Sequence, residues 1–171
     1  MPKFFGLFAL SILTLSVVVH LSTFLPTPMF FMASAWPLHI GAMLAFFPMI
    51  FWLQRLKKQT NLAPDVTRNF NRLLGTYLSP PLRMLFFVVG MYTIINFCIF
   101  GYNLSEGTPT PVGDHYEIKS HGRFVRTITK DEYDHLQACL LRGFSGHWIF
   151  FSFAPTVFFL VCVPKLPVKE T

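Results

Sequence analysis

Four long apolar segments alternate with polar connections along this chain. The segments are Phe4–Leu25, Trp36–Leu53, Leu82–Leu104 and His147–Val163. Each falls within the roughly 17–25 residues that a helix needs to cross a bilayer. Apart from Arg83 at one edge, none of them contains Asp, Glu, Lys or Arg. The pattern predicts an all-α transmembrane protein in which residues 1–171 form a single domain, a four-helix membrane bundle.

The first segment also has features of a secretory signal peptide. Lys3 precedes it, and Ala33-Ser34-Ala35 has the small residues of a cleavage site. Its apolar run is longer than the roughly 7–15 residues of a signal peptide, and the run ends well before Ala35. We therefore expect the segment to be retained as the first span.

The composition is typical of a chain whose main solvent is lipid. Hydrophobic residues make up 53% of the sequence and charged residues 13%, against about 25% charged residues in a soluble domain. The formal net charge of +6 would suit a nucleic-acid-binding protein, but basic residues beside membrane spans explain it more simply. We expect the lipid bilayer as a partner and no nucleic acid.

The balance of charges in the connections predicts the orientation of the spans. Gln54–Pro81 contains five basic residues and one acidic residue, whereas Ser105–Gly146 contains five basic and six acidic ones. Lys3 precedes the first span, and the C-terminal tail has two lysines against one glutamate. Because basic excess marks cytoplasmic segments, we expect cytoplasmic N- and C-termini and place Ser105–Gly146 outside.

The cytoplasmic connection contains a short amphipathic pattern. Val66, Phe70, Leu73 and Leu74 recur at helical spacing, and Gly75 suits a C-terminal cap. We expect a helix that lies on the inner leaflet, with its arginines near the lipid headgroups.

The outer connection, residues 105–146, is predicted to fold as a cap inserted between the third and fourth spans. Gly107–Pro111 is expected to be an extended linker. Two alternating segments, His115–Lys119 and Arg123–Ile128, flank the turn Ser120-His121-Gly122. Alternation around a glycine-containing turn predicts a β-hairpin.

A helix is predicted to follow the hairpin and to run toward Arg142. Thr129 and Glu132 have the spacing of a capping box. A lone hairpin is marginally stable in water. It must therefore pack on this helix, on the membrane surface or on a protein partner. In the first case the hairpin and the helix form a small outer β-hairpin-plus-helix cap.

Several short motifs resemble a pattern in small uncharacterised bacterial multi-pass membrane proteins. The motifs are Gly113-x-x-Tyr116, His121-Gly122, Glu132-Tyr133, His39-Ile40-Gly41 and the junction Arg142-Gly143-Phe144-Ser145-Gly146-His147-Trp148. The resemblance implies a location in the bacterial inner (plasma) membrane. It implies no activity and no ligand.

Three histidines on three spans are predicted at a similar depth near the outer boundary. His20 lies about one turn below the outer end of the first span, His39 about one turn into the second, and His147 opens the fourth. Imidazoles from different helices can bind a transition metal or ligate haem. Alternatively, each histidine makes a separate interhelical or interfacial contact, because the sequence leaves the rotation of each helix free.

Arg142, Ser145 and Trp148 mark the predicted outer junction between the cap helix and the fourth span. Arg and Trp are typical interface anchors. The glycines between them allow either a sharp turn or a close approach of backbones, and the junction can also form a nest for a small ligand or a lipid headgroup. Ser145 and His147 are poorly spaced as nucleophile and base, because groups two positions apart seldom align without a third.

The third span carries an interhelical polar pair, Tyr92 and Asn96, which are i,i+4 neighbours and share a face. In the second span, Gly41 and Ala45 have the spacing of small residues at close helix contacts. Both pairs are expected to face other helices.

Taken with the charges, these features favour a non-catalytic integral membrane protein, either an accessory subunit or an interaction protein whose outer cap meets a protein partner. The sequence contains no phosphate-binding loop, zinc-protease motif or nucleophile elbow, so we do not expect an enzyme. Two alternatives stay open: a haem- or metal-binding membrane protein that uses His20, His39 and His147, and a small transporter. The lack of any carboxylate inside the spans weighs against the transporter.

Overall fold

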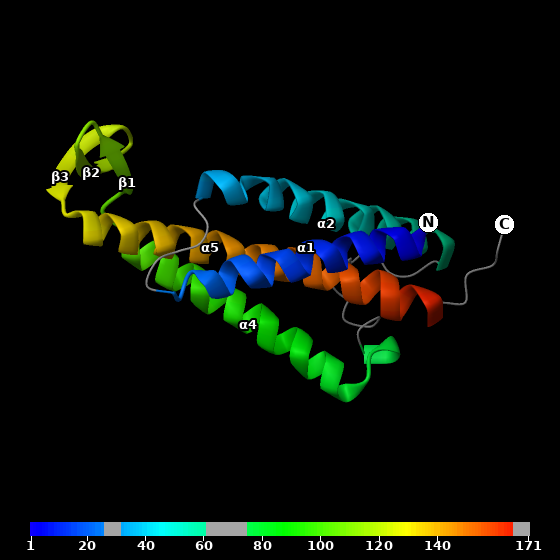
Figure 1. Cartoon of the computed structure of the whole chain (residues 1–171). Coiled ribbons are helices and arrows are strands. Elements are labelled where there is room, and N and C mark those ends of the chain that lie inside the picture. Colours follow the sequence, from blue (N-terminus) through cyan, green and yellow to red (C-terminus); the bar gives the residue numbers. More distant parts are fainter. Residues whose placement is uncertain (26–31, 61–74, 166–171) are drawn as a thin grey trace.

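Four helices of the protein are long and apolar enough to cross a membrane. The computed structural model describes residues 1–25, 32–60 and 75–165. The four helices are α1 (Pro2–Ser22), α2 (Met32–Thr60), α4 (Pro80–Asn103) and α5 (Lys130–Val157). They form an elongated bundle with a small sheet at one end (Figure 1). The predicted amphipathic helix at Val66–Leu74 lies outside the described residues.

The central helix of the bundle is α5. It packs against α1, α2 and α4, and Figure 1 shows it running along the whole bundle. In its apolar part 61% of the residues are buried, against 11% for α4. Helix α4 therefore joins the bundle mainly through α5 and turns most of its surface outward.

The predicted cap helix and the fourth span are one continuous helix, α5. Of the two alternatives for the junction glycines, a sharp turn or a close approach of backbones, the structure therefore excludes the turn. No sharp turn forms between Arg142 and His147. Instead, a Cβ atom at Gly143 would overlap the side chain of Phe100, and one at Gly146 would overlap Asn96. The glycines serve the close approach of α5 to α4, while the helix continues through the junction.

Helix α5 ends irregularly. A π-helical turn, Phe158–Cys162, follows it, and then a 3-10 turn, Val163–Lys165. Pro155 lies three residues before the π-helical turn and has no N–H to donate within the helix.

The outer connection contains a three-stranded antiparallel sheet in the order β1-β2-β3. The strands are β1 (Thr108–Val112), β2 (His115–Ser120) and β3 (Arg123–Ile128). The predicted hairpin corresponds to β2 and β3. Its two-residue turn, His121-Gly122, has positive φ at both residues, as a type I′ turn requires.

The prediction of an extended linker at Gly107–Pro111 is wrong, because most of this segment is strand β1. Pro109 pairs with Ile118 and Pro111 with Tyr116 in the register of β1 and β2. Two prolines in five residues suggested a linker because proline cannot donate to a strand ladder. At the edge of a sheet this is tolerated, since one side of the strand needs no donor.

The sheet packs on the beginning of α5. Ile118 and Ile128 are buried against Leu136, and the rings of Tyr116 and Tyr133 stack with centroids 4.5 Å apart. The predicted helix start is confirmed, because the side chain of Thr129 accepts a hydrogen bond from the backbone N–H of Glu132 at 3.2 Å. We call the three strands together with the first two turns of α5, Lys130–Gln137, the cap.

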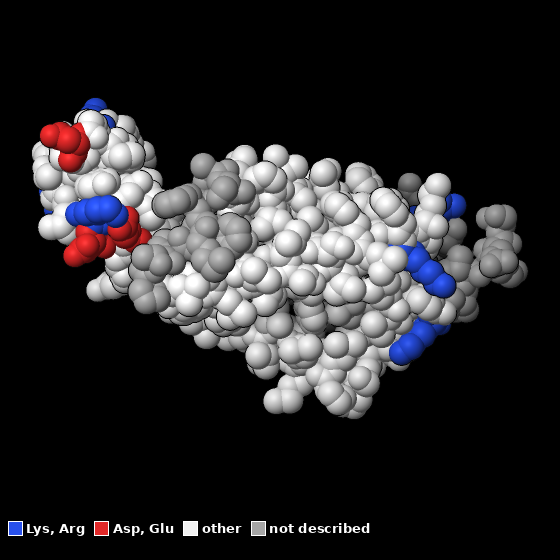
Figure 2. All heavy atoms as spheres, in the orientation of Figure 1, with Lys and Arg blue, Asp and Glu red and all other residues white. Residues whose placement is uncertain are grey.

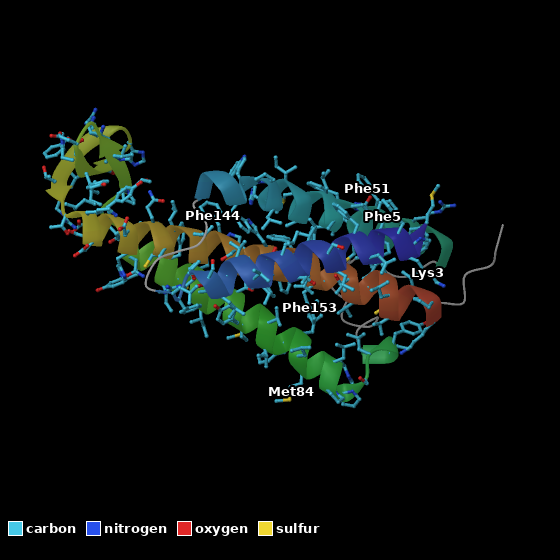
Figure 3. All side chains as sticks on the ribbon, viewed as in Figure 1. Lys3, Phe5, Phe51, Met84, Phe144 and Phe153 are labelled. Atoms are coloured by element: carbon cyan, nitrogen blue, oxygen red, sulfur yellow. The ribbon has the colours of Figure 1, made fainter. Side chains whose placement is uncertain are left out.

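Charged side chains gather at the two ends of the molecule (Figure 2). All six described acidic residues lie at or beside the cap. The described basic side chains at the opposite end are Lys3, Arg55, Arg83 and Lys165. The body between the two ends carries large exposed apolar side chains, such as Met84, which is 70% exposed and points away from the bundle (Figure 3). We call this surface of the four long helices, between the two charged ends, the apolar belt.

Candidate functional site

Side chains from all four long helices meet on the cap side of the apolar belt. Ser145 and Trp148 lie three residues apart on α5, so both point into the bundle, and both are fully buried. Their partners come from α1, α2 and α4. This set is the polar junction, and it consists of Arg142, Ser145, His147 and Trp148 of α5, His20 of α1 with Thr23 at its end, His39 of α2, and Tyr92 and Asn96 of α4.

A chain of hydrogen bonds through His20 connects α4, α1 and α5. Nδ1 of His20 lies 2.8 Å from Oγ of Ser145, and its Nε2 contacts the hydroxyl of Tyr92. The hydroxyl of Ser145 donates to the carbonyl oxygen of Arg142 at 3.3 Å. With that donor used, Ser145 accepts from Nδ1–H of His20, and Nε2 accepts from Tyr92. Both ring nitrogens are thus occupied, and the chain links three helices inside the bundle.

Asn96 connects α4 to α5 at the same level. Its Nδ2 donates to the carbonyl oxygens of Arg142 at 2.9 Å and Gly143 at 3.4 Å. Buried amide groups need such partners, because leaving one unpaired costs about 1–3 kcal/mol. Gly146 leaves the space into which the Asn96 amide fits. The polar contact and the close helix approach therefore depend on each other.

Arg142 reaches from α5 to the end of α1. Its Nε donates to Oγ1 of Thr23 at 3.1 Å and its Nη2 to the carbonyl oxygen of Thr23 at 2.7 Å. The guanidinium carbon lies 4.1 Å from the centre of the Phe24 ring. A cation at the C-terminus of a helix is favourable, because the free carbonyl groups there carry partial negative charge.

His39 and Trp148 connect α2 to α5. Trp148 Nε1 donates to Nδ1 of His39 at 2.9 Å. Because the indole N–H can only donate, Nδ1 of His39 is the acceptor and the neutral ring carries its proton on Nε2. The ring of His39 also stacks on Trp36 with centroids 4.9 Å apart.

His147 makes a local contact within α5. Its Nδ1 lies 2.8 Å from the carbonyl oxygen of Gly143. A carbonyl oxygen only accepts, so Nδ1 carries the proton of the neutral ring. The ring stacks near Phe144 and meets the edge of Phe97.

The structure does not bring His20, His39 and His147 together as a ligand set. Each binds a different partner, and the described residues contain no group of three or more His, Cys, Asp or Glu side chains that could hold a metal ion. A metal takes the lone pair of a ring nitrogen, and both nitrogens of His20 and Nδ1 of His39 are already in hydrogen bonds. The histidines do lie in the same region of the bundle, but helix rotation directs their rings to different partners.

The imidazole beside Ser145 belongs to His20 rather than to His147. A serine hydroxyl 2.8 Å from an imidazole nitrogen has the spacing of a nucleophile and its base. A nucleophile must also be reached by its substrate, and Ser145 is fully buried in the middle of a helix. The geometry therefore supports a structural role for the pair, as a connection between α1 and α5.

Ion pairs fasten the strands of the cap to the start of α5. Arg126 of β3 contacts Glu132 at 2.6 Å and Glu106 at 2.8 Å, and these hydrogen bonds hold the pKa of Arg126 above its usual value. The carboxylate of Glu132, at the start of α5, is therefore paired with the guanidinium of Arg126 on β3. On the exposed side, a hydrogen bond with Glu117 at 2.9 Å raises the pKa of His115.

Sequence reasoning identified the residue types of the polar junction but not their partners. Ser145 and His20 are 125 positions apart. No sequence pattern identified Thr23 as a residue of the junction. The depth of His20 in the first span was the one feature that placed it near the junction. Which residues it would touch depended on how α1 is rotated against α5.

The chain matches no protein-family model, no curated protein and no solved structure. The fold and the polar junction define a small helical bundle with four membrane-compatible helices, internal interhelical hydrogen bonds and a folded cap at one end.

Proposed function

We propose that this chain is a non-catalytic multi-pass protein of the bacterial inner membrane, which holds its cap outside the bilayer to bind a protein partner. The observation that carries the proposal is the continuity of α5. One helix, Lys130–Val157, forms both a wall of the cap and the buried centre of the bundle. The cap is therefore attached rigidly to the membrane-compatible part rather than through a flexible linker.

The distribution of charge supports the membrane location and the orientation. The apolar belt separates two charged ends (Figure 2), as expected for a protein that spans a bilayer. The described side chains at the end opposite the cap include basic residues and no acidic ones. By the positive-inside rule that end faces the cytoplasm, together with both termini, and the cap lies outside.

Cysteine labelling tests the orientation. We expect a Ser120→Cys variant in a cysteine-free background to react with a membrane-impermeant maleimide in intact cells. A Lys3→Cys variant in the same background is the matched control, and it should react only after lysis. Labelling of position 3 but not 120 in intact cells would reverse the assignment and remove the cap from the outside.

Strand β3 is the surface of the cap that best suits a partner. It is an edge strand, and in Figure 1 it lies farthest from the bundle. A bulge inserts Val125 between the paired residues Phe124 and Arg126, and Phe124 and Val125 remain 59% and 44% exposed. The other edge strand, β1, contains two prolines, which discourage pairing with another strand. Of the two edge strands, β3 is therefore the one that presents large exposed apolar side chains.

The charges of the cap indicate what the partner carries. Lys119, Arg126 and Lys130 each have a carboxylate partner within or beside the cap. Arg123, at the start of β3, has no ion pair in the described part of the chain. We infer an extracytoplasmic protein segment with apolar side chains that meet Phe124 and Val125, and with a carboxylate that meets Arg123.

Site-specific photo-crosslinking in intact cells tests this surface. A photoreactive residue at Phe124 should yield one discrete adduct, and the same residue at Thr108, exposed on β1, should not. Adding Arg123→Glu should lower the yield at Phe124 about tenfold, because a central interface contact is worth about 1–2 kcal/mol. No adduct at Phe124, or the same adducts at both positions, would overturn the proposed partner surface.

A further inference from the structure

The guanidinium of Arg142 is held in one orientation at the boundary between the apolar belt and the cap. Thr23 accepts hydrogen bonds from Nε and Nη2, and Phe24 covers one face of the group. A guanidinium has five N–H donors, so three N–H groups stay free of hydrogen bonds to the described residues. The side chain is only partly buried, which leaves these donors open to the surroundings.

No carboxylate of the described residues compensates the charge of Arg142. Five of the six described acidic side chains pair with other groups of the cap, namely Arg126, Lys119, Lys130 and His115. The sixth, Asp131, lies eleven residues before Arg142 on the same helix, a distance of about 16 Å along the axis. Even Asp134 is about 12 Å away by the same rise. The connection at residues 26–31 contains no acidic residue.

The position of Arg142 along the bundle axis indicates which anion it binds. The guanidinium lies level with the end of α1, where the helix leaves the apolar belt. Arginine side chains near the ends of membrane helices reach the headgroup region. The common anion in that region is phosphate, and Arg binds phosphate through several charge-assisted hydrogen bonds.

We propose that Arg142 binds a phosphate group at the outer surface of the membrane, and that its source is the headgroup of an anionic phospholipid. The free N–H groups of the guanidinium donate to the phosphate oxygens, while Thr23 and Phe24 keep the group in place. The inference rests on the membrane location proposed above. The bound lipid then contacts both α1 and α5 at the position where Arg142 connects the two helices.

Lipid binding to the full chain in mild detergent tests the proposal by native mass spectrometry. Phosphatidylglycerol should bind about fivefold more tightly than phosphatidylcholine, because the choline cation of phosphatidylcholine offsets the charge of its phosphate, whereas the glycerol headgroup leaves that charge for Arg142. An R142Q variant should lose this preference. The matched control is K130Q, which removes an exposed basic side chain of the cap, and it should keep the preference. Equal binding of the two lipids by the wild-type protein would overturn the proposal.

Two further measurements keep the test decisive. R142K retains the charge but not the planar fork, so it should bind phosphatidylglycerol with intermediate preference, and it carries the test if R142Q does not fold. Inorganic phosphate that displaces phosphatidylglycerol at equal concentration would assign the site to a soluble phosphate compound and overturn the lipid assignment. Failure of the lipid preference with intact cysteine-labelling topology would refute the Arg142 site alone, whereas reversed topology would refute the proposed membrane orientation.

Discussion

Replacing Trp148 by alanine should lower the free energy of unfolding by about 3 kcal/mol, the lower end of the range for Trp→Ala in buried cores. Trp148 is fully buried, and it packs with Val19, Ala42 and Leu141 where three helices meet. The lower end applies because the separated helices keep apolar surroundings in the micelles of the measurement, which removes part of the hydrophobic term. The cavity and the lost dispersion contacts remain.

Trp148→Phe is the matched control. It keeps an aromatic ring in the site but removes the N–H that binds Nδ1 of His39 at 2.9 Å. We expect a loss of about 1 kcal/mol, the usual cost of one unmade hydrogen bond. Unfolding by denaturant in mixed micelles, followed by circular dichroism, measures both variants. An equal loss for the two variants would show that packing of the indole contributes little.

Replacing Gly143 by alanine should destabilise the protein by about 1–3 kcal/mol, the typical cost of overpacking. The new methyl group would overlap the side chain of Phe100, whose Cβ would lie only 2.7 Å away. That atom is fixed to the backbone of α4, so a change of rotamer cannot remove the overlap. Helices α4 and α5 must separate, which weakens the hydrogen bonds from Asn96 to α5.

Gly101→Ala provides a control with the opposite expected sign. Gly101 lies in α4 one residue after Phe100, and a Cβ atom there would meet nothing within 4 Å. Alanine should therefore stabilise the helix by about 0.5–1 kcal/mol. The same unfolding measurement compares the two variants. A stabilising effect of alanine at both positions would mean that α4 and α5 do not pack as closely as the structure has them.

The sequence determined the parts of this protein that depend on composition and on spacing along the chain. Four apolar runs, with Arg83 as their one charged residue, lie in the four helices that are long and apolar enough to cross a membrane. The glycine-containing turn between β2 and β3 and the cap at Thr129 were predicted from local residue chemistry. Such features depend on neighbours within four residues, so they can be read in order along the chain.

Other predictions were wrong or left two alternatives, because some residue patterns are compatible with two local structures. Pro109 and Pro111 suit a linker and an edge strand equally, and the open edge of β2 decided for the strand. Gly143 and Gly146 permit a turn or a close contact, and packing against Phe100 and Asn96 decided for the contact. In both cases the deciding group lies on another element.

The tertiary structure alone decided which side chains meet in the polar junction. The sequence placed His20, His39 and His147 at similar depth, which follows from the fixed rise of a helix. It could not assign Ser145 and Tyr92 to His20, Thr23 to Arg142, or Trp148 to His39. Those pairings depend on the rotation of each helix about its axis, which is set by the packing of all four helices against one another.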